Sequence, residues 1–166
     1  MTLILGIDPG LQHTGWGIIV SKNNSLSYID CGTISPSADL RMAERLKCLH
    51  DGLTAVIARH RPEEAAVEET FVNVSGSSTL KLGQARGALM LTLSLAGINV
   101  SEYSATMVKK SVVGSGHADK KQIAMMVKTL LPASQAKKAD AADALAVAIC
   151  HAHQRTVRKL TAGMKA

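Results

Sequence analysis

Residues 3–17 of the chain read LILGIDPGLQHTGWG. The run opens with residues of the kind that form a buried β-strand, and Asp8 stands at the end of that strand. Pro9 and Gly10 follow at once and end it, and the apolar residues 16–20 predict an antiparallel partner strand. A charge at the tip of a buried strand is costly without a partner. Asp8 is therefore either a ligand for a cation or the first residue of an Asp-Pro-Gly turn.

The charge of this 166-residue chain is unevenly distributed. Residues 1–100 hold 8 Lys/Arg and 9 Asp/Glu, a net of −1, whereas residues 101–166 hold 11 Lys/Arg and 4 Asp/Glu, a net of +7. A segregated positive surface is typical of proteins that bind a polyanion, nucleic acid first. A basic surface with no partner is the alternative, and charge by itself does not decide between them.

The cysteines and the apolar segments indicate the compartment. Three cysteines are widely spaced and form no CxxC pair, which argues against a zinc site or a disulfide framework and suits a reducing cytoplasm. The N-terminus shows no signal-peptide pattern. The longest apolar region, residues 89–98, is interrupted by polar residues and is too short to span a bilayer. We therefore expect a cytoplasmic protein without a membrane segment.

The order of predicted elements indicates an α/β fold. A three-strand meander over residues 3–34 comes first, and Asp39 then caps a helix that runs to about residue 61. The later elements are a strand at 65–67, a helix from 78 or 79 to about 96, a strand at 98–103, and helices at 105–113, 120–131 and from 139 onward. This order predicts a mixed five-stranded sheet with helices on both faces. If the first and fourth strands pair, Asp8 and Glu68 lie side by side.

The predicted helix over residues 79–96 is apolar on more than one face. Gly83 and Gly87 lie four residues apart and allow another element to approach closely. A helix that is apolar around most of its circumference is buried on two sides. One side belongs to the sheet of its own chain. The other is covered either by a second subunit or by a second helix of the same chain, and the pattern leaves both open.

Four carboxylates stand at predicted strand tips and at one helix start. Asp140 and Asp143 share a helix face and have no Lys or Arg three or four residues on, although helix capping alone also explains them. Asp8 and Glu68 each end an apolar run, and Glu69 competes with Glu68 but points to the opposite face. An all-oxygen cluster suits Mg²⁺ or Mn²⁺. Two such ions hold the attacking and leaving oxygens of an in-line phosphoryl displacement.

Five stretches of the chain carry a family resemblance. They are GIDPG at 6–10, VEETF at 67–71, KLGQARG at 81–87, VVGSGHADK at 112–120 and ADAADALA at 139–146. Together, and in this order, they resemble the RuvC family of Holliday junction resolvases over nearly the whole chain. The resemblance implies a ribonuclease H-like fold, with residues 1–154 as the nuclease domain and residues 155–166 as a basic C-terminal tail.

The resemblance also implies an activity and its partners. Members are homodimeric, Mg²⁺-dependent endonucleases that nick two opposed strands of a four-way DNA junction symmetrically during homologous recombination and DNA repair. Their usual partner is the RuvA–RuvB branch-migration complex. Carried over by motif, the metal-binding catalytic acids are Asp8, Glu68, Asp140 and Asp143. We expect two Mg²⁺ ions in each active site, with Mn²⁺ able to substitute.

The candidate DNA-binding residues are basic or aromatic. Lys109, Lys110, Lys120 and Lys121 flank a Gly-Ser-Gly loop and are placed to hold phosphates, Lys109 and Lys120 foremost by resemblance. For each lysine the alternative is a solvated surface charge. Phe71, on a loop of small residues, resembles the aromatic residue that stacks on a base near the cut. Its alternative is a small core anchor.

The histidines and two rival functions complete the prediction. We expect His151 and His153 to be surface residues or phosphate contacts, and His13 beside the Asp8 turn is a candidate for an assisting role. A sugar-kinase-like ATPase shares the first glycine loop, but it needs two related domains and a second phosphate loop that 166 residues do not supply. The other rival is a catalytically silent junction-binding module, against which the four acids count.

Overall fold

One mixed sheet organises the molecule. The computed structural model describes residues 1–163 except 24, 70–74 and 137. The elements are β1 (Thr2–Asp8), β2 (Thr14–Lys22), β3 (Ser25–Ile34), α1 (Met42–His60), β4 (Glu64–Glu68), α2 (Gly76–Leu95), β5 (Asn99–Tyr103), α3 (Ala105–Val113), α4 (Lys120–Leu130) and α5 (Ala139–Gly163). The strand order is β3-β2-β1-β4-β5, with antiparallel pairing among the first three strands and parallel pairing of β1 with β4 and β4 with β5. The expected five-stranded α/β architecture is confirmed.

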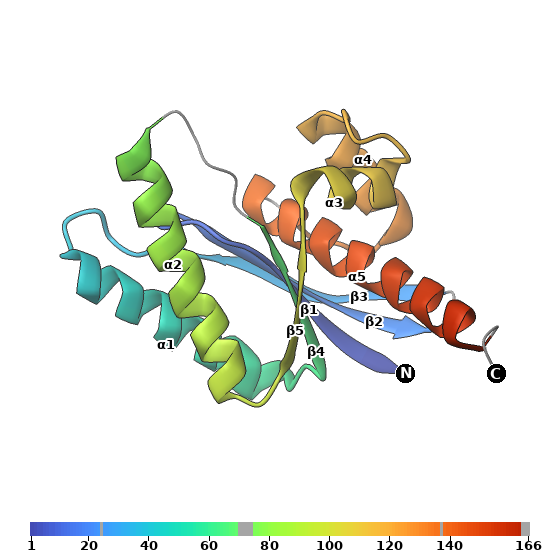
Figure 1. Ribbon diagram of the computed structural model, residues 1–166, viewed down its shortest axis with the longest axis horizontal. Helices are drawn as coiled ribbons and strands as arrows, with labels where there is room; N and C mark the ends of the chain where they lie inside the picture. Colours follow the sequence, from blue (N-terminus) through green and yellow to red (C-terminus); the bar gives the residue numbers. More distant parts are fainter. Residues whose placement is uncertain (24, 70–74, 137, 164–166) are drawn as a thin grey trace.

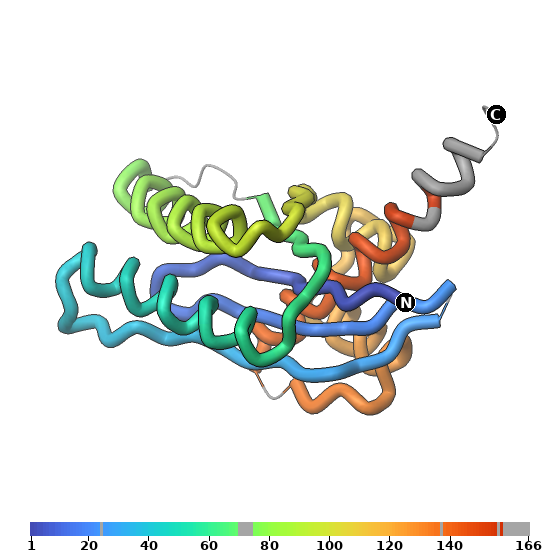
Figure 2. Tube along the Cα trace, turned by 90° about the horizontal axis from the view of Figure 1, so that it is seen from below, coloured from blue at the N-terminus to red at the C-terminus, as the bar shows by residue number. Residues whose placement is uncertain are grey.

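Helices cover both faces of this sheet (Figure 1). Helices α1 and α2 run side by side on one face, as Figure 2 also shows, and α5 crosses the other face with α3 and α4 packed against it. The alternation of β1 divides the apolar side chains between two cores: Ile4 packs toward α5, whereas Leu5 and Ile7 pack toward α1 and α2. No helix in the described part of the chain has the length and apolar character needed to cross a membrane.

Glycines let α5 lie directly on the sheet. A side chain at Gly6 would overlap the backbone of α5 and would bring its Cβ to 2.6 Å from the amide nitrogen of Ala148. Gly15 on β2 lies against the carbonyl group of Asp140 in the same way. Because β1 and β2 lack side chains at these points, the helix backbone approaches the strands themselves. This contact fixes the N-terminal turn of α5 beside the end of β1.

The other end of α5 is anchored by a polar network. The Nε2 atom of His151 lies 2.7 Å from Oε2 of Glu64, and its Nδ1 lies 2.9 Å from the hydroxyl of Tyr103. Arg155 Nε donates to Oε1 of Glu64 at 2.8 Å. Burial raises the pKa of Glu64, but the hydrogen bonds from His151 and Arg155 outweigh it and hold that pKa below its usual value. The network ties α5 to β4 and β5.

Several boundaries and one residue differ from the prediction. Helix α1 begins at Met42 and not next to Asp39, because the Glu44 carboxylate reaches back to accept from the Arg41 amide at 2.9 Å. The prediction of a surface role for His151 is wrong, since its side chain is buried and hydrogen-bonded within the network just described. Helix α5 runs without a break across residues 154 and 155, where a domain and a tail were expected to meet.

Candidate active site at the ends of β1 and β4

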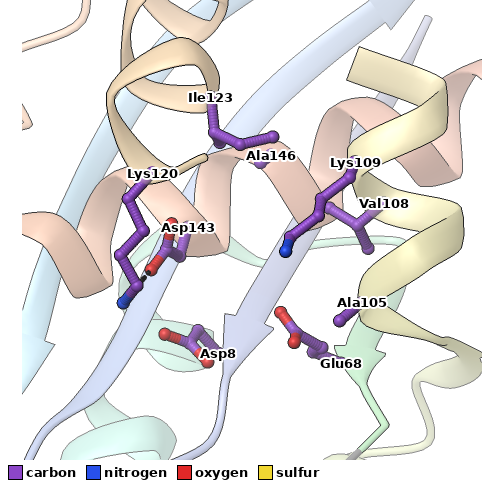
Figure 3. Close-up of a pocket in the computed structure, with 9 residues that line it drawn as sticks. All are labelled: Asp8, Glu68, Ala105, Val108, Lys109, Lys120, Ile123, Asp143 and Ala146. Atoms are coloured by element: carbon purple, nitrogen blue, oxygen red, sulfur yellow. Dashed lines mark hydrogen bonds and ion pairs between the residues drawn. The ribbon is translucent and has the colours of Figure 1, made fainter. Parts of the chain in front are cut away.

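Three of the four predicted acids line one cavity. The register that pairs Ile7 with Val67 puts the carboxyl ends of β1 and β4 together, so Asp8 and Glu68 follow on adjacent strands. Asp143 joins them from the first turns of α5 (Figure 3). The cavity has a volume of about 240 Å³ and is lined by Asp8, Glu68, Ala105, Val108, Lys109, Lys120, Ile123, Asp143 and Ala146. The pairing of strands that the sequence left conditional is therefore present.

Burial and charge repulsion act together on the carboxylates of this cavity. Burial, together with the neighbouring charges of Glu68, Asp143 and Asp140, raises the pKa of Asp8 to about 8, and Lys120 opposes the shift. Burial and the charge of Asp143 likewise raise the pKa of Glu68. Carboxylates behave in this way when they are crowded together with too little positive charge. A bound cation would therefore lower the repulsion among these carboxylates.

Two lysines reach the cavity from the helices that cover it. Lys109 comes from α3, and Lys120 comes from the start of α4, where its Nζ lies 3.3 Å from Oδ2 of Asp143 (Figure 3). The charge of Asp143 raises the pKa of Lys120, and the Lys120 side chain is 79% exposed. The two other predicted lysines, Lys110 and Lys121, are exposed and do not line the cavity.

Asp140 lies at the rim of a different hollow. It lines a groove that contains Asp8 and the turn after it, together with residues of α1 and α2. Its charge still contributes to the raised pKa of Asp8. Asp8 is therefore shared between the two hollows, with Glu68 and Asp143 in one and Asp140 in the other.

The donor set fits a hard divalent cation by its chemistry. All the acidic ligands are carboxylate oxygens, and burial together with the like charges around them raises the pKa values of Asp8 and Glu68. Among the described residues, no three acidic, histidine or cysteine side chains are gathered closely enough to hold one ion together. Lys120 is paired with Asp143 in this arrangement and so occupies one of the candidate ligands.

Sequence reasoning placed some residues well and missed others. Glu68, and not its neighbour Glu69, lines the cavity, as strand alternation predicts. Phe71 lies outside the described residues. Arg45 and Lys81 line the groove beside Asp8 but were not singled out. Lys81 begins the KLGQARG stretch that carries the family resemblance, but neither position indicates closeness to Asp8, because α1 and α2 meet the Asp8 turn only through the tertiary fold.

Comparison with known proteins identifies the family. The family model described as "Crossover junction endodeoxyribonuclease RuvC" matches residues 4–151. This chain belongs to the RuvC family. A RuvC relative from Paramagnetospirillum magneticum is 61% identical over 158 residues, which are 95% of each chain. One from Rhodopseudomonas palustris (strain TIE-1) is 60% identical over 92% of this chain and 87% of its own.

A solved RuvC structure shows the same fold. The Thermus thermophilus RuvC in complex with Holliday junction substrate superposes with a TM-score of 0.87 at 33% identity, over 95% of this chain and 96% of that one. The expected ribonuclease H-like architecture and membership of a nuclease family are both confirmed. In a RuvC chain, a cavity that combines carboxylates with lysines at the ends of β1 and β4 suits the hydrolysis of a phosphodiester.

Proposed function

We propose that this protein is a Holliday junction resolvase, which cuts four-way DNA junctions by two symmetric phosphodiester hydrolyses. One observation carries the proposal. In a chain of the RuvC family, Asp8, Glu68 and Asp143 share a cavity with Lys109 and Lys120. The recombination and repair role, the cytoplasmic location and the RuvA–RuvB partnership follow from the same family resemblance.

The four acids are the proposed ligands of two Mg²⁺ ions, for which Mn²⁺ can substitute. Such ions lower the pKa of a bound water and stabilise a departing 3′ oxygen. Asp8 is partly buried at the end of β1 and follows the fully buried Ile7, which limits the movement of its carboxylate. Lys109 and Lys120 bring positive charge to a phosphate that enters the cavity. When a phosphate and cations are bound, Lys120 no longer needs Asp143 as its only partner.

The remaining lysines and the aromatic residue are proposed DNA contacts. Lys110 and Lys121 are exposed beside the cavity helices and are suited to phosphates farther along the strand. Phe71 keeps its proposed role of stacking on a base near the cut. This role rests on the family resemblance alone.

A homodimer is the second part of the proposal. Leu80, Gly83, Gly87, Leu91 and Leu95 form one stripe along α2 at helical spacing. The three leucines are 65%, 59% and 73% exposed, and apart from the adjacent turns of α2 itself no atom of the described residues lies within 4 Å of a Cβ built at either glycine. A second copy of the chain is the proposed occupant, because a two-fold junction requires two equivalent active sites. The alternative of a covering helix from the same chain finds no support in the described part.

The test is cleavage of a labelled synthetic four-way junction. The protein is incubated with the junction in Mg²⁺ and in chelator, beside a linear duplex of the same sequence. Paired symmetric nicks in the junction alone, and only with metal, are expected. Binding without cleavage by any divalent ion would identify a silent junction-binding module instead. Equal cutting of the duplex would keep the nuclease chemistry and remove the junction selectivity.

A further inference from the structure

A second hollow opens at Asp8 beside the catalytic cavity, between the start of α5 and the helices α1 and α2 of the other sheet face. This groove has a volume of about 480 Å³ and lies between the turn at residues 8–13, α1 and the first turns of α2. Arg45 from α1 and Lys81 from α2 line it, together with His13. The catalytic cavity instead lies against α3, α4 and α5. Asp8 therefore lies between two hollows, and each of them contains two cationic side chains, Lys109 and Lys120 in one and Arg45 and Lys81 in the other.

Arg45 supplies a positive charge that the described residues leave unbalanced. Its guanidinium donates to the carbonyl oxygen of Leu11 at 3.1 Å, which braces the turn after Asp8. Its Nε is buried and has no hydrogen-bond partner in the described part of the chain, and no carboxylate there forms an ion pair with it. An arginine carries five donor hydrogens in a fixed fork. A buried donor without a partner is costly, so this guanidinium is suited to an anion that enters the groove.

Two further groups complete the groove. Lys81 is exposed on α2, and no ion pair is found for it among the described residues. His13 holds Ser35 through Nδ1 at 2.8 Å, which leaves Nε2 for another partner. Arginine and lysine side chains are the commonest ligands of nucleic-acid phosphates. The groove thus contains a planar guanidinium from Arg45 and a flexible ammonium group from Lys81.

We propose that this groove binds backbone phosphates of the cleaved DNA strand on the side of the cut away from Lys109 and Lys120. The inference rests on the proposed resolvase function and extends it. A strand that crosses Asp8 is then held on both sides of the scissile phosphate, which fixes that phosphate over the acids. Positioning of this kind contributes strongly to phosphoryl transfer. Asp8 and Asp140 also line the groove and repel phosphates, so binding is strongest when a divalent cation neutralises them.

Lys81→Gln tests the site, because an exposed side chain is replaced without disturbing packing. The control is Lys22→Gln, which makes the same charge change at the far end of β2. Junction affinity is measured in Mg²⁺ with Asp8→Asn present in every protein, so that the junction stays uncut. We expect Lys81→Gln to bind about 3–10-fold more weakly and to lower the slope of log K against log salt by about 0.7–0.9, the loss of one phosphate contact. Lys22→Gln is expected to change neither.

Junctions with one neutral methylphosphonate at successive backbone positions locate the contact. A methylphosphonate at one or two positions on a single side of the cut should weaken binding by the protein that retains Lys81. The same methylphosphonates should hardly change the affinity of Lys81→Gln, since that variant has already lost the phosphate contact. Arg45→Lys should weaken binding further at those positions while keeping the charge. The proposed site is refuted if Lys81→Gln and Lys22→Gln have the same junction affinity and salt slope. It is also refuted if every methylphosphonate weakens binding by Lys81→Gln as much as it weakens binding by the protein that retains Lys81. If the groove is refuted in this way but the wild-type protein cuts junctions normally, the proposed resolvase function still holds. If the wild-type protein neither binds nor cuts junctions, both the groove and the resolvase function are refuted.

Discussion

Gly15 on β2 lies against the backbone carbonyl of Asp140 so closely that a methyl group at Gly15 would overlap the carbonyl oxygen. Asp140 is the second residue of α5, and Asp143 follows about one turn later in the catalytic cavity. The position of two proposed metal ligands is therefore set by the absence of a side chain on a neighbouring strand. Nothing in the local sequence of α5 determines that position.

Gly15→Ala should push the start of α5 away from Asp8. We expect junction cleavage to fall at least tenfold, because misplacing a ligand by about 1 Å is enough to cost that much. The overlap should also lower the free energy of unfolding by about 1–3 kcal/mol. Gly76→Ala is the matched control, since a Cβ built at Gly76 meets no atom of another described element within 4 Å. Normal cleavage by Gly15→Ala, measured beside its unfolding curve, would show that this contact does not position the acids.

Asp8→Asn should abolish cleavage and yet stabilise the metal-free protein at high pH. The pKa of Asp8 rises from 3.8 to about 8 in the folded chain, so its contribution to stability is full below 3.8 and is lost as the pH rises through 8. An asparagine has no charge to bury. In chelator at pH 9 the variant should be more stable by roughly 1–4 kcal/mol, and the difference should vanish near pH 4.

Urea unfolding of both proteins at the two pH values measures this difference. Asp39→Asn is the control, because Asp39 is exposed and lies outside the cavity. Excess Mg²⁺ should reverse the order at high pH by stabilising only the protein that retains Asp8. If the Asp8 protein is as stable as Asp8→Asn in chelator at pH 9, burial and the neighbouring acids do not raise the pKa of Asp8 as described.

Glu64→Gln should loosen the far anchor of α5. The substitution removes a carboxylate that accepts hydrogen bonds from His151 and Arg155. We expect a loss of about 1–3 kcal/mol in the free energy of unfolding at pH 7, the usual cost for hydrogen bonds to a charged group. The pKa of Glu64 lies below its usual 4.5, so this stabilisation is present above 4.5 and fades as the pH falls further.

The two proteins should therefore converge in stability in acid. Glu69→Gln provides the comparison, since Glu69 is exposed and one carboxylate is again replaced by its amide. Chemical denaturation at pH 7 and at acid pH distinguishes the two cases. A loss at pH 7 that persists undiminished in acid would show that the charge of Glu64 is not what anchors α5.

Leu91→Glu should separate the proposed dimer. It places a charge at the middle of the exposed stripe on α2, where the leucine is 59% exposed and its loss costs the single chain little. We expect the apparent mass in solution to fall by half and paired nicking of a junction to be lost with it. Met125→Glu on α4 is the control, because Met125 is 64% exposed on a different helix. An unchanged mass and normal paired nicks would place the dimer contact elsewhere.

Much of this molecule was predictable from local patterns. The apolar runs before Asp8 and Glu68 predicted two strands that end in carboxylates, and both strands are present. Helix α3 has the predicted bounds, because Ser104 caps it and Gly114 ends it with a left-handed backbone. The start of α1 was predicted less well, since the capping group belongs to Glu44 inside the helix and not to the preceding Asp39.

The sequence by itself determined the family, the order of strands and helices, and the acids that end β1 and β4. These depend on short-range chemistry: runs of apolar residues, turn formers and caps lie within a few positions of one another. Only the tertiary structure decided that Asp140 lines a different hollow from Asp143, that His151 is buried, and that Arg45 stands beside Asp8. Each of these depends on how closely helices and strands far apart in the chain approach, and that distance is set by packing, above all by the glycines beneath α5.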